Sequence, residues 1–189
     1  MNRRDAMRLM SATIGSALAT SVLAETAMRY PDSFWQQLPV GYTAAQIDLI
    51  AAIADTIIPP TSTPGAAEAG VQNVIPIMLR DCYSEADQKV FADGLVDLDK
   101  RARVMYYQIF ASCSTEQRTE LLKLLEQDYI AERSQANPPP NFFKIAKDLT
   151  IVGYFTSEIG ATQALRHLLT PGRSEQDIAY TKGEKAWSM

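Results

Sequence analysis

Apolar residues recur at helical spacing along most of the chain, and proline-containing stretches separate the segments that show this spacing. Capping signals mark three of the expected helix starts: T-x-x-Q at Thr43, S-x-x-D at Ser84 and S-T-E-Q at Ser114. We expect helices over residues 43–57, 69–82, 84–109, 114–130 and 141–169. Because strand signals are nearly absent, the pattern predicts an all-α fold: a single compact helical bundle with an irregular C-terminal tail.

The expected last helix has two different faces between residues 151 and 169. Apolar side chains that share one sector of the helical wheel indicate the side facing the protein's own core: Ile151, Val152, Phe155, Ile159 and Leu169. Small residues fall on the opposite side: Gly153, Ser157, Gly160 and Ala164, with Ala161 at its margin. By analogy with packed membrane helices, a row of small residues lets another backbone approach closely. The wheel therefore predicts a docking face made of these small residues.

Length and composition are those of an ordinary folded protein. Of the 189 residues, 47% are hydrophobic and 21% are charged, which suits one domain with a real core plus a processed leader. The net charge of −4 argues against a general nucleic-acid binder, because no basic surface stands out to neutralise phosphates.

The first residues have the pattern of an export signal. Arg3 and Arg4 precede a weakly apolar run that ends in Val-Leu-Ala before Glu25, as in a twin-arginine (Tat) signal peptide cleaved after Ala24. An ordinary amphipathic N-terminal helix is the alternative, and retention of the leader as an anchor stays open. We expect a leader over residues 1–24, a lead-in over 25–42, a helical domain over 43–170 and a tail over 171–189. This organisation predicts a periplasmic protein.

Twin-arginine export carries proteins that have already folded, so it suits a chain that holds a cofactor or whose partner holds one. The sequence lacks the usual cofactor signatures. Two cysteines are too few for an iron–sulfur cluster, and no C-x-x-C-H, G-x-G-x-x-G or G-x-S-x-G motif is present. A single histidine cannot build a His-rich metal site. These observations disfavour an autonomous redox or metal enzyme, and we expect no cofactor and no metal in this chain.

Ser157, Glu158 and His167 are the residues that could suggest an active site. Glu158 and His167 are nine residues apart, which in a straight helix puts them on opposite faces and about 13 Å apart along the axis. They cannot then act as an acid–base pair, and a lone histidine near a helix C-terminus is more often a structural cation. We therefore expect no catalytic residue, and expect Glu158 to bind an arginine or backbone amides of a neighbour.

The two cysteines leave three alternatives open. In an oxidising periplasm Cys82 and Cys113 could pair and close a loop of about 30 residues. They could also remain two buried thiols, or one of them could form a bridge to another subunit.

Several stretches together resemble the gluconate 2-dehydrogenase subunit 3 family, the small subunits of membrane-associated sugar and polyol dehydrogenases. Three blocks carry the resemblance: A-D-T-I-I-P, T-P-G-A and A-G-V within residues 54–71; G-Y-F-T-S-E-I-G-A-T and L-R within 153–166; and P-G-R at 171–173 with K-A-W at 185–187. The family often has Tyr and a P-V-P-G run after the Leu-Arg pair, whereas residues 167–172 read H-L-L-T-P-G. This departure weakens any role for His167 taken from relatives.

The resemblance implies a non-catalytic subunit. Its partner would be a large FAD-containing dehydrogenase of the glucose–methanol–choline (GMC) class, often joined by a c-type cytochrome. The large subunit in such systems typically lacks a leader, so it would reach the Tat translocase bound to the small subunit. FAD is then expected on the partner and not on this chain.

The small-residue face and a tail too poor in apolar residues to fold alone are the expected contacts with that partner. The expected interface residues are Gly153, Ser157, Glu158, Gly160, Ala161, Ala164, Arg166, Pro171, Gly172, Arg173, Tyr180 and Trp187. Two alternatives are a stand-alone periplasmic helical protein that binds a small molecule, and an enzyme using Ser157, Glu158 and His167.

Overall fold

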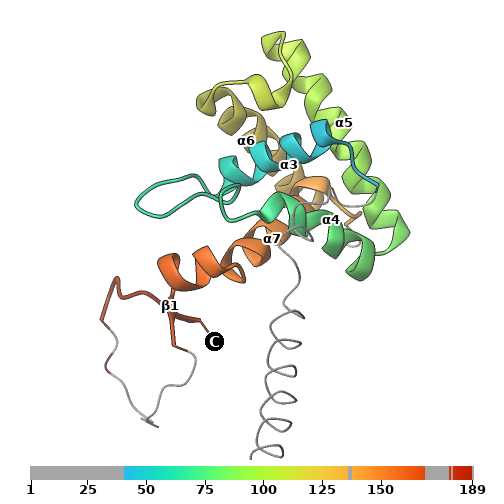
Figure 1. Ribbon diagram of the computed structural model, residues 1–189. Coiled ribbons are helices and arrows are strands. Elements are labelled where there is room, and N and C mark those ends of the chain that lie inside the picture. Colours follow the sequence, from blue (N-terminus) through green and yellow to red (C-terminus); the bar gives the residue numbers. More distant parts are fainter. Residues whose placement is uncertain (1–40, 136–137, 169–178, 180, 189) are drawn as a thin grey trace, which may run out of the picture. The chain divides into compact units, whose positions relative to one another are not determined.

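The computed structural model of the chain describes residues 41–135, 138–168, 179 and 181–188 (Figure 1). The expected leader, and the lead-in up to residue 40, lie outside the described residues. The expected all-α fold is confirmed. The helices are α3 (Ala44–Ile57), α4 (Val71–Cys82), α5 (Glu85–Tyr106), the 3-10 turn η1 (Phe110–Ser112), α6 (Thr115–Glu132), α7 (Phe142–Phe155) and the π-helical turn η2 (Gly160–Ala164).

The sequence signals placed most helix starts correctly. Thr43 and Gln46 form a reciprocal capping box at the start of α3, with the Thr43 amide 2.9 Å from Gln46 Oε1. Ser114 and Gln117 form the same arrangement before α6. Each box satisfies backbone N–H groups that have no partner inside the helix, which is why these residues define the boundary.

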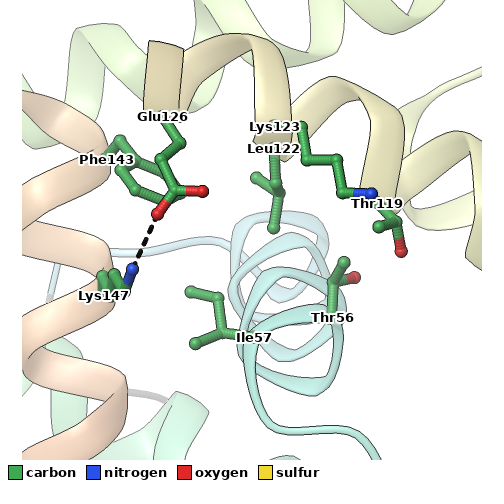
Figure 2. A pocket seen from close by; sticks show the side chains of 8 residues that line it. All are labelled: Thr56, Ile57, Thr119, Leu122, Lys123, Glu126, Phe143 and Lys147. Atoms are coloured by element: carbon green, nitrogen blue, oxygen red, sulfur yellow. Dashed lines mark hydrogen bonds and ion pairs between the residues drawn. The ribbon is translucent and has the colours of Figure 1, made fainter. Parts of the chain in front are cut away.

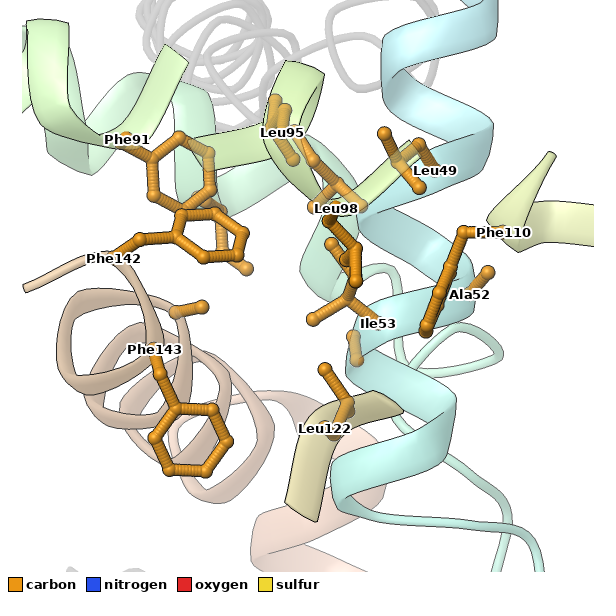
Figure 3. Close-up of a cluster of buried hydrophobic side chains, with 14 of the residues drawn as sticks. Leu49, Ala52, Ile53, Phe91, Leu95, Leu98, Phe110, Leu122, Phe142 and Phe143 are labelled. Carbon is orange, nitrogen blue, oxygen red and sulfur yellow. The ribbon is translucent and has the colours of Figure 1, made fainter. Parts of the chain in front are cut away.

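Helix α7 contacts α3, α4, α5 and α6, and α3 and α5 likewise each contact all the other long helices. Figure 3 shows the core where side chains from α3, α5, η1, α6 and α7 converge. The centres of the Phe91 and Phe142 rings lie 5.3 Å apart. Gly94 makes room for Phe142, since a Cβ on Gly94 would lie 2.2 Å from Phe142 Cγ. Helix α5 ends at Tyr106, before the expected end at residue 109, and Ile109 lies beyond it and is exposed.

The expected continuous helix over 141–169 is wrong. Helix α7 ends at Phe155, and a new turn begins after Ser157. The Ser157 hydroxyl donates to the Tyr154 carbonyl at 2.7 Å and accepts from the Gly160 amide at 3.0 Å. Ser157 thereby ends one helix and caps the next turn, as short hydroxyl side chains do at helix termini.

The chain continues from η2 into a small parallel strand pair. Strand β1 (Arg166–His167) pairs with β2 (Trp187–Ser188), so residues about twenty apart in the sequence lie side by side. This pair is the only strand structure within the described residues. None of the helices in this part of the chain is both long and apolar enough to cross a membrane.

The two faces of the last helix are the reverse of the expected ones. Gly153 is buried, whereas Ile151, Val152 and Phe155 are exposed. The inward face is determined by Phe142, Ile145, Ala146 and Leu149, and Gly153 is in phase with them at 100° per residue. A wheel drawn only from residue 151 onward misses this phase.

Candidate docking surface

Tyr154 connects the end of α7 to a loop about ninety residues earlier in the chain. Its ring is buried, and its hydroxyl donates to the Pro64 carbonyl at 2.9 Å. The Thr63 hydroxyl oxygen lies 3.3 Å from the Tyr154 hydroxyl oxygen. A buried phenol needs a polar partner, and here that partner is the loop between α3 and α4.

This loop is also fixed by hydrogen bonds to the C-terminal end of α3. One carboxylate oxygen of Asp55 accepts the Ala67 amide at 2.7 Å, and the Ala66 amide donates to the Ile58 carbonyl at 3.0 Å. Gly65 is required by the same packing, because a Cβ there would lie 2.7 Å from Asp55 Oδ1 and 2.9 Å from Pro60 Cδ. The base of the loop is therefore fixed, while residues 59–62 are exposed.

Two segments without charged residues meet at Tyr154. Residues 56–67 and 149–157 contain no Asp, Glu, Lys or Arg. On α7, the exposed side chains of the second segment are apolar: Ile151 is 38% exposed, Val152 44% and Phe155 40%. We call these three side chains together with residues 59–62 the uncharged surface. Its composition matches that of interface cores, which are depleted of charged residues.

The small residues that were expected to face a partner pack against the chain itself. A Cβ on Gly153 would lie 3.2 Å from Val71 Cγ1, and one on Gly160 would lie 1.9 Å from the Tyr154 carbonyl oxygen. The expected orientation of Gly153 and Gly160 is therefore wrong, because close helix packing inside the domain requires them. Ser157, Ala161 and Ala164 are half-buried.

The end of the tail folds onto the same chain. The Arg166 guanidinium lies 3.7 Å from the centre of the Trp187 ring and forms an ion pair with Glu184. The Ser188 hydroxyl contacts the Ala161 carbonyl at 3.3 Å. This part of the tail therefore contacts the domain itself, whereas the sequence led us to expect it on a partner. The remaining tail residues of the expected interface, Pro171, Gly172, Arg173 and Tyr180, lie outside the described residues.

The residues considered for catalysis are not joined to one another. His167 Nδ1 lies 3.2 Å from the Ser188 hydroxyl, whereas the Ser157 hydroxyl is bonded to backbone atoms. Glu158 is exposed at the start of the turn before η2. Across the described ranges, no hydrogen bond links Ser157, Glu158 and His167.

Figure 2 shows a shallow pocket between α3, α6 and α7. It is lined by Thr56, Ile57, Thr119, Leu122, Lys123, Glu126, Phe143 and Lys147, and its volume is about 170 Å³. Lys147 forms an ion pair with Glu126 at 2.8 Å and lies over the Phe143 ring. Lys147 and Glu126 thus bind each other, and the pocket's volume is below the 300–1,000 Å³ usual for ligand pockets.

The sequence of this domain matches a known protein family. The family model described as gluconate 2-dehydrogenase subunit 3 matches residues 44–172, which is more than half of the chain. The chain belongs to this family. Neither a search of curated proteins nor a search of solved structures gave a match.

Membership in the gluconate 2-dehydrogenase subunit 3 family implies a multi-subunit dehydrogenase complex. Both parts of the uncharged surface lie within the matched residues. The sequence blocks that carried the resemblance include Asp55, Gly65, Tyr154 and Gly160, and the structure shows that these four residues build the junction beneath that surface. Sequence reasoning missed this role, although the missing charges in both segments are visible in the sequence.

Both cysteines of this subunit 3 protein are free. Cys82 is exposed at the end of α4, and Cys113 is buried, with its thiol 3.5 Å from the Ile109 carbonyl. The structure thus lacks the bridge between them that the sequence left open. Burial raises the pKa of the Cys113 thiol, so less of the reactive thiolate is present at neutral pH.

We expect an alkylating reagent to add one label to the native chain, at Cys82, and a second label only after unfolding. The reason is that alkylation requires an accessible sulfur: Cys82 is exposed, whereas Cys113 is buried and its burial raises the pKa of the thiol. Mass spectrometry of the intact protein, followed by peptide mapping, measures this. Equal labelling of both residues in the folded chain would contradict the buried position of Cys113.

Proposed function

We propose that this chain is the non-catalytic small subunit of a periplasmic dehydrogenase complex, required for Tat export, assembly and stability of the catalytic subunit. The catalytic subunit in this proposal is an FAD-containing enzyme of the GMC class acting on a sugar or polyol, with a c-type cytochrome as a further subunit. The family match supports the subunit role, and the twin-arginine pattern supports export.

The observation that carries the proposal is the apolar outer face of α7. Ile151, Val152 and Phe155 form it, and the chain's own core leaves each of them over one third exposed. Covering a large apolar side chain contributes about 1.5–3 kcal/mol when it is fully buried, so three half-exposed ones favour a partner. Stable subunit interfaces are built from such side chains.

The second candidate is a stand-alone binding protein for a small molecule. The pocket between α3, α6 and α7 is small and contains a satisfied ion pair. A larger hollow of about 480 Å³ is lined by mostly exposed residues of α6 alone, so it does not enclose a ligand. The proposal therefore places binding on a surface and the redox chemistry on the partner.

A tagged pull-down of this chain from native membranes, followed by an absorption spectrum, tests the proposal. We expect a large partner with the spectrum of oxidised flavin, because the cofactor is assigned to that subunit. A colourless chain that purifies alone as a monomer would favour the stand-alone binding protein instead.

A further inference from the structure

We propose that residues 59–62 and the side chains of Ile151, Val152 and Phe155 form one docking surface for an uncharged, apolar region of the catalytic subunit. We also assign Tyr154 the role of a positioning residue, which fixes the loop relative to α7 from beneath this surface. The inference rests on the proposed function and adds where the partner binds and what its contact region must look like.

The first argument is the distribution of charge. With 21% charged residues in the chain, two segments of the lengths of 56–67 and 149–157 would carry about four charges, and they carry none. Elsewhere the surface is rich in ion pairs, such as Lys89 with Asp93 and Lys144 with Asp148. A surface free of charge is matched by a partner region that is also free of charge, since burying an unpaired charge is costly.

The same observation selects a protein as the occupant. An anionic lipid surface is bound through Lys or Arg beside apolar side chains, and nucleic acid is bound through a basic surface. The uncharged surface has neither. It offers apolar side chains from α7 and, from the loop, the hydroxyl groups of Thr61 and Ser62. Such a mixture is typical of subunit interfaces.

The second argument is that the loop is fixed before any partner binds. Tyr154 donates to the Pro64 carbonyl, Asp55 accepts the Ala67 amide, and Gly65 lets Asp55 and Pro60 approach. A loop that is already ordered loses less conformational entropy when it binds, which favours a long-lived complex. The Tyr154 ring is buried, so its contribution to binding acts through the loop and not through contact with the partner.

The test uses the tagged full-length chain co-expressed with the catalytic subunit of its own complex. Phe155→Glu places a charge on the α7 part of the surface, and Ser62→Lys places one on the exposed loop. Ile130→Glu on α6 is the matched control, because Ile130 is also an exposed apolar residue, at 52%. Circular dichroism checks that all variants keep their helical content and melting temperature.

We expect Phe155→Glu and Ser62→Lys each to reduce the flavin subunit recovered per tagged chain by about tenfold or more, as for charge placed in an interface. Ile130→Glu should recover as much as the wild type. If the wild type recovers no flavoprotein, the proposed function fails. If the wild type recovers it and the two surface variants do so equally well, the function stands and this docking surface is wrong. A wild-type homodimer that both variants dissociate, with the flavoprotein retained, would assign the surface to a second copy and overturn the proposal.

Tyr154→Phe tests the positioning role separately, since it removes only the hydroxyl. We expect the flavin subunit to dissociate about five- to tenfold faster, the loss of one buried hydrogen bond, while the cooperative unfolding of the isolated chain is retained. An unchanged dissociation rate would show that the hydroxyl serves the fold alone.

Discussion

Gly160→Ala is expected to destabilise the folded chain by about 3 kcal/mol or more, a large share of the stability of a domain of this size. The new Cβ would lie 1.9 Å from the Tyr154 carbonyl oxygen and 2.7 Å from its carbon. These are backbone atoms at the end of α7, and the buried, hydrogen-bonded Tyr154 side chain holds them in place. Neither residue 160 nor the Tyr154 backbone can move away without breaking the contact between η2 and the end of α7.

The matched control is Gly153→Ala in the preceding turn. A Cβ there would meet only the Val71 side chain, at 3.2 Å, and alanine gains up to about 1 kcal/mol over glycine within a helix. We expect the cost of the Val71 contact and the gain in helix propensity to cancel, so that the free energy of unfolding changes by less than about 1 kcal/mol. Urea unfolding followed by circular dichroism measures both variants. Equal midpoints for wild type and Gly160→Ala would show that η2 does not pack on α7 as described.

The parts of the fold that the sequence could predict are those set by local signals. Local signals placed the helix starts, because Thr43 and Ser114 each bond to backbone groups three residues away. The break after Phe155 was also local in origin, since Ser157 caps the turn that contains Gly160, but an S-x-x-G pattern inside a helix-length run is a weak signal. The facing of α7 depended on residues 142–149, outside the stretch first drawn on a wheel.

The candidate site could be predicted only in part, because its geometry depends on long-range contacts. No periodicity relates Tyr154 to Pro64, and only the folded chain brings the two segments together. What the sequence does contain is the absence of charge in both segments. Asp55, Gly65 and Gly160 lie in the blocks that carry the family resemblance, and the structure shows that these three residues serve packing within the domain.

Replacing Arg3 and Arg4 together by lysine is expected to lower periplasmic activity of the catalytic subunit to that of cells lacking this chain. Under the proposed function, the large subunit has no leader and crosses the membrane only when bound to this chain. The twin-arginine translocase recognises the arginine pair, and lysine keeps the positive charge of the leader while removing the guanidinium groups. Flavin-dependent dehydrogenase activity is measured in periplasmic and cytoplasmic fractions.

The lysine pair separates recognition of the arginines from the general need for positive charge. A Sec-type leader tolerates lysine, so unchanged periplasmic activity would show that the export part of the proposal is wrong while leaving the docking surface untouched. Arg8→Lys, a leader arginine outside the pair, is the control and should export normally. Because the double variant leaves residues 59–62 and Phe155 intact, the two subunits should still co-purify, now from the cytoplasm. Active complex retained there would show that assembly precedes export, as a translocase for folded proteins requires.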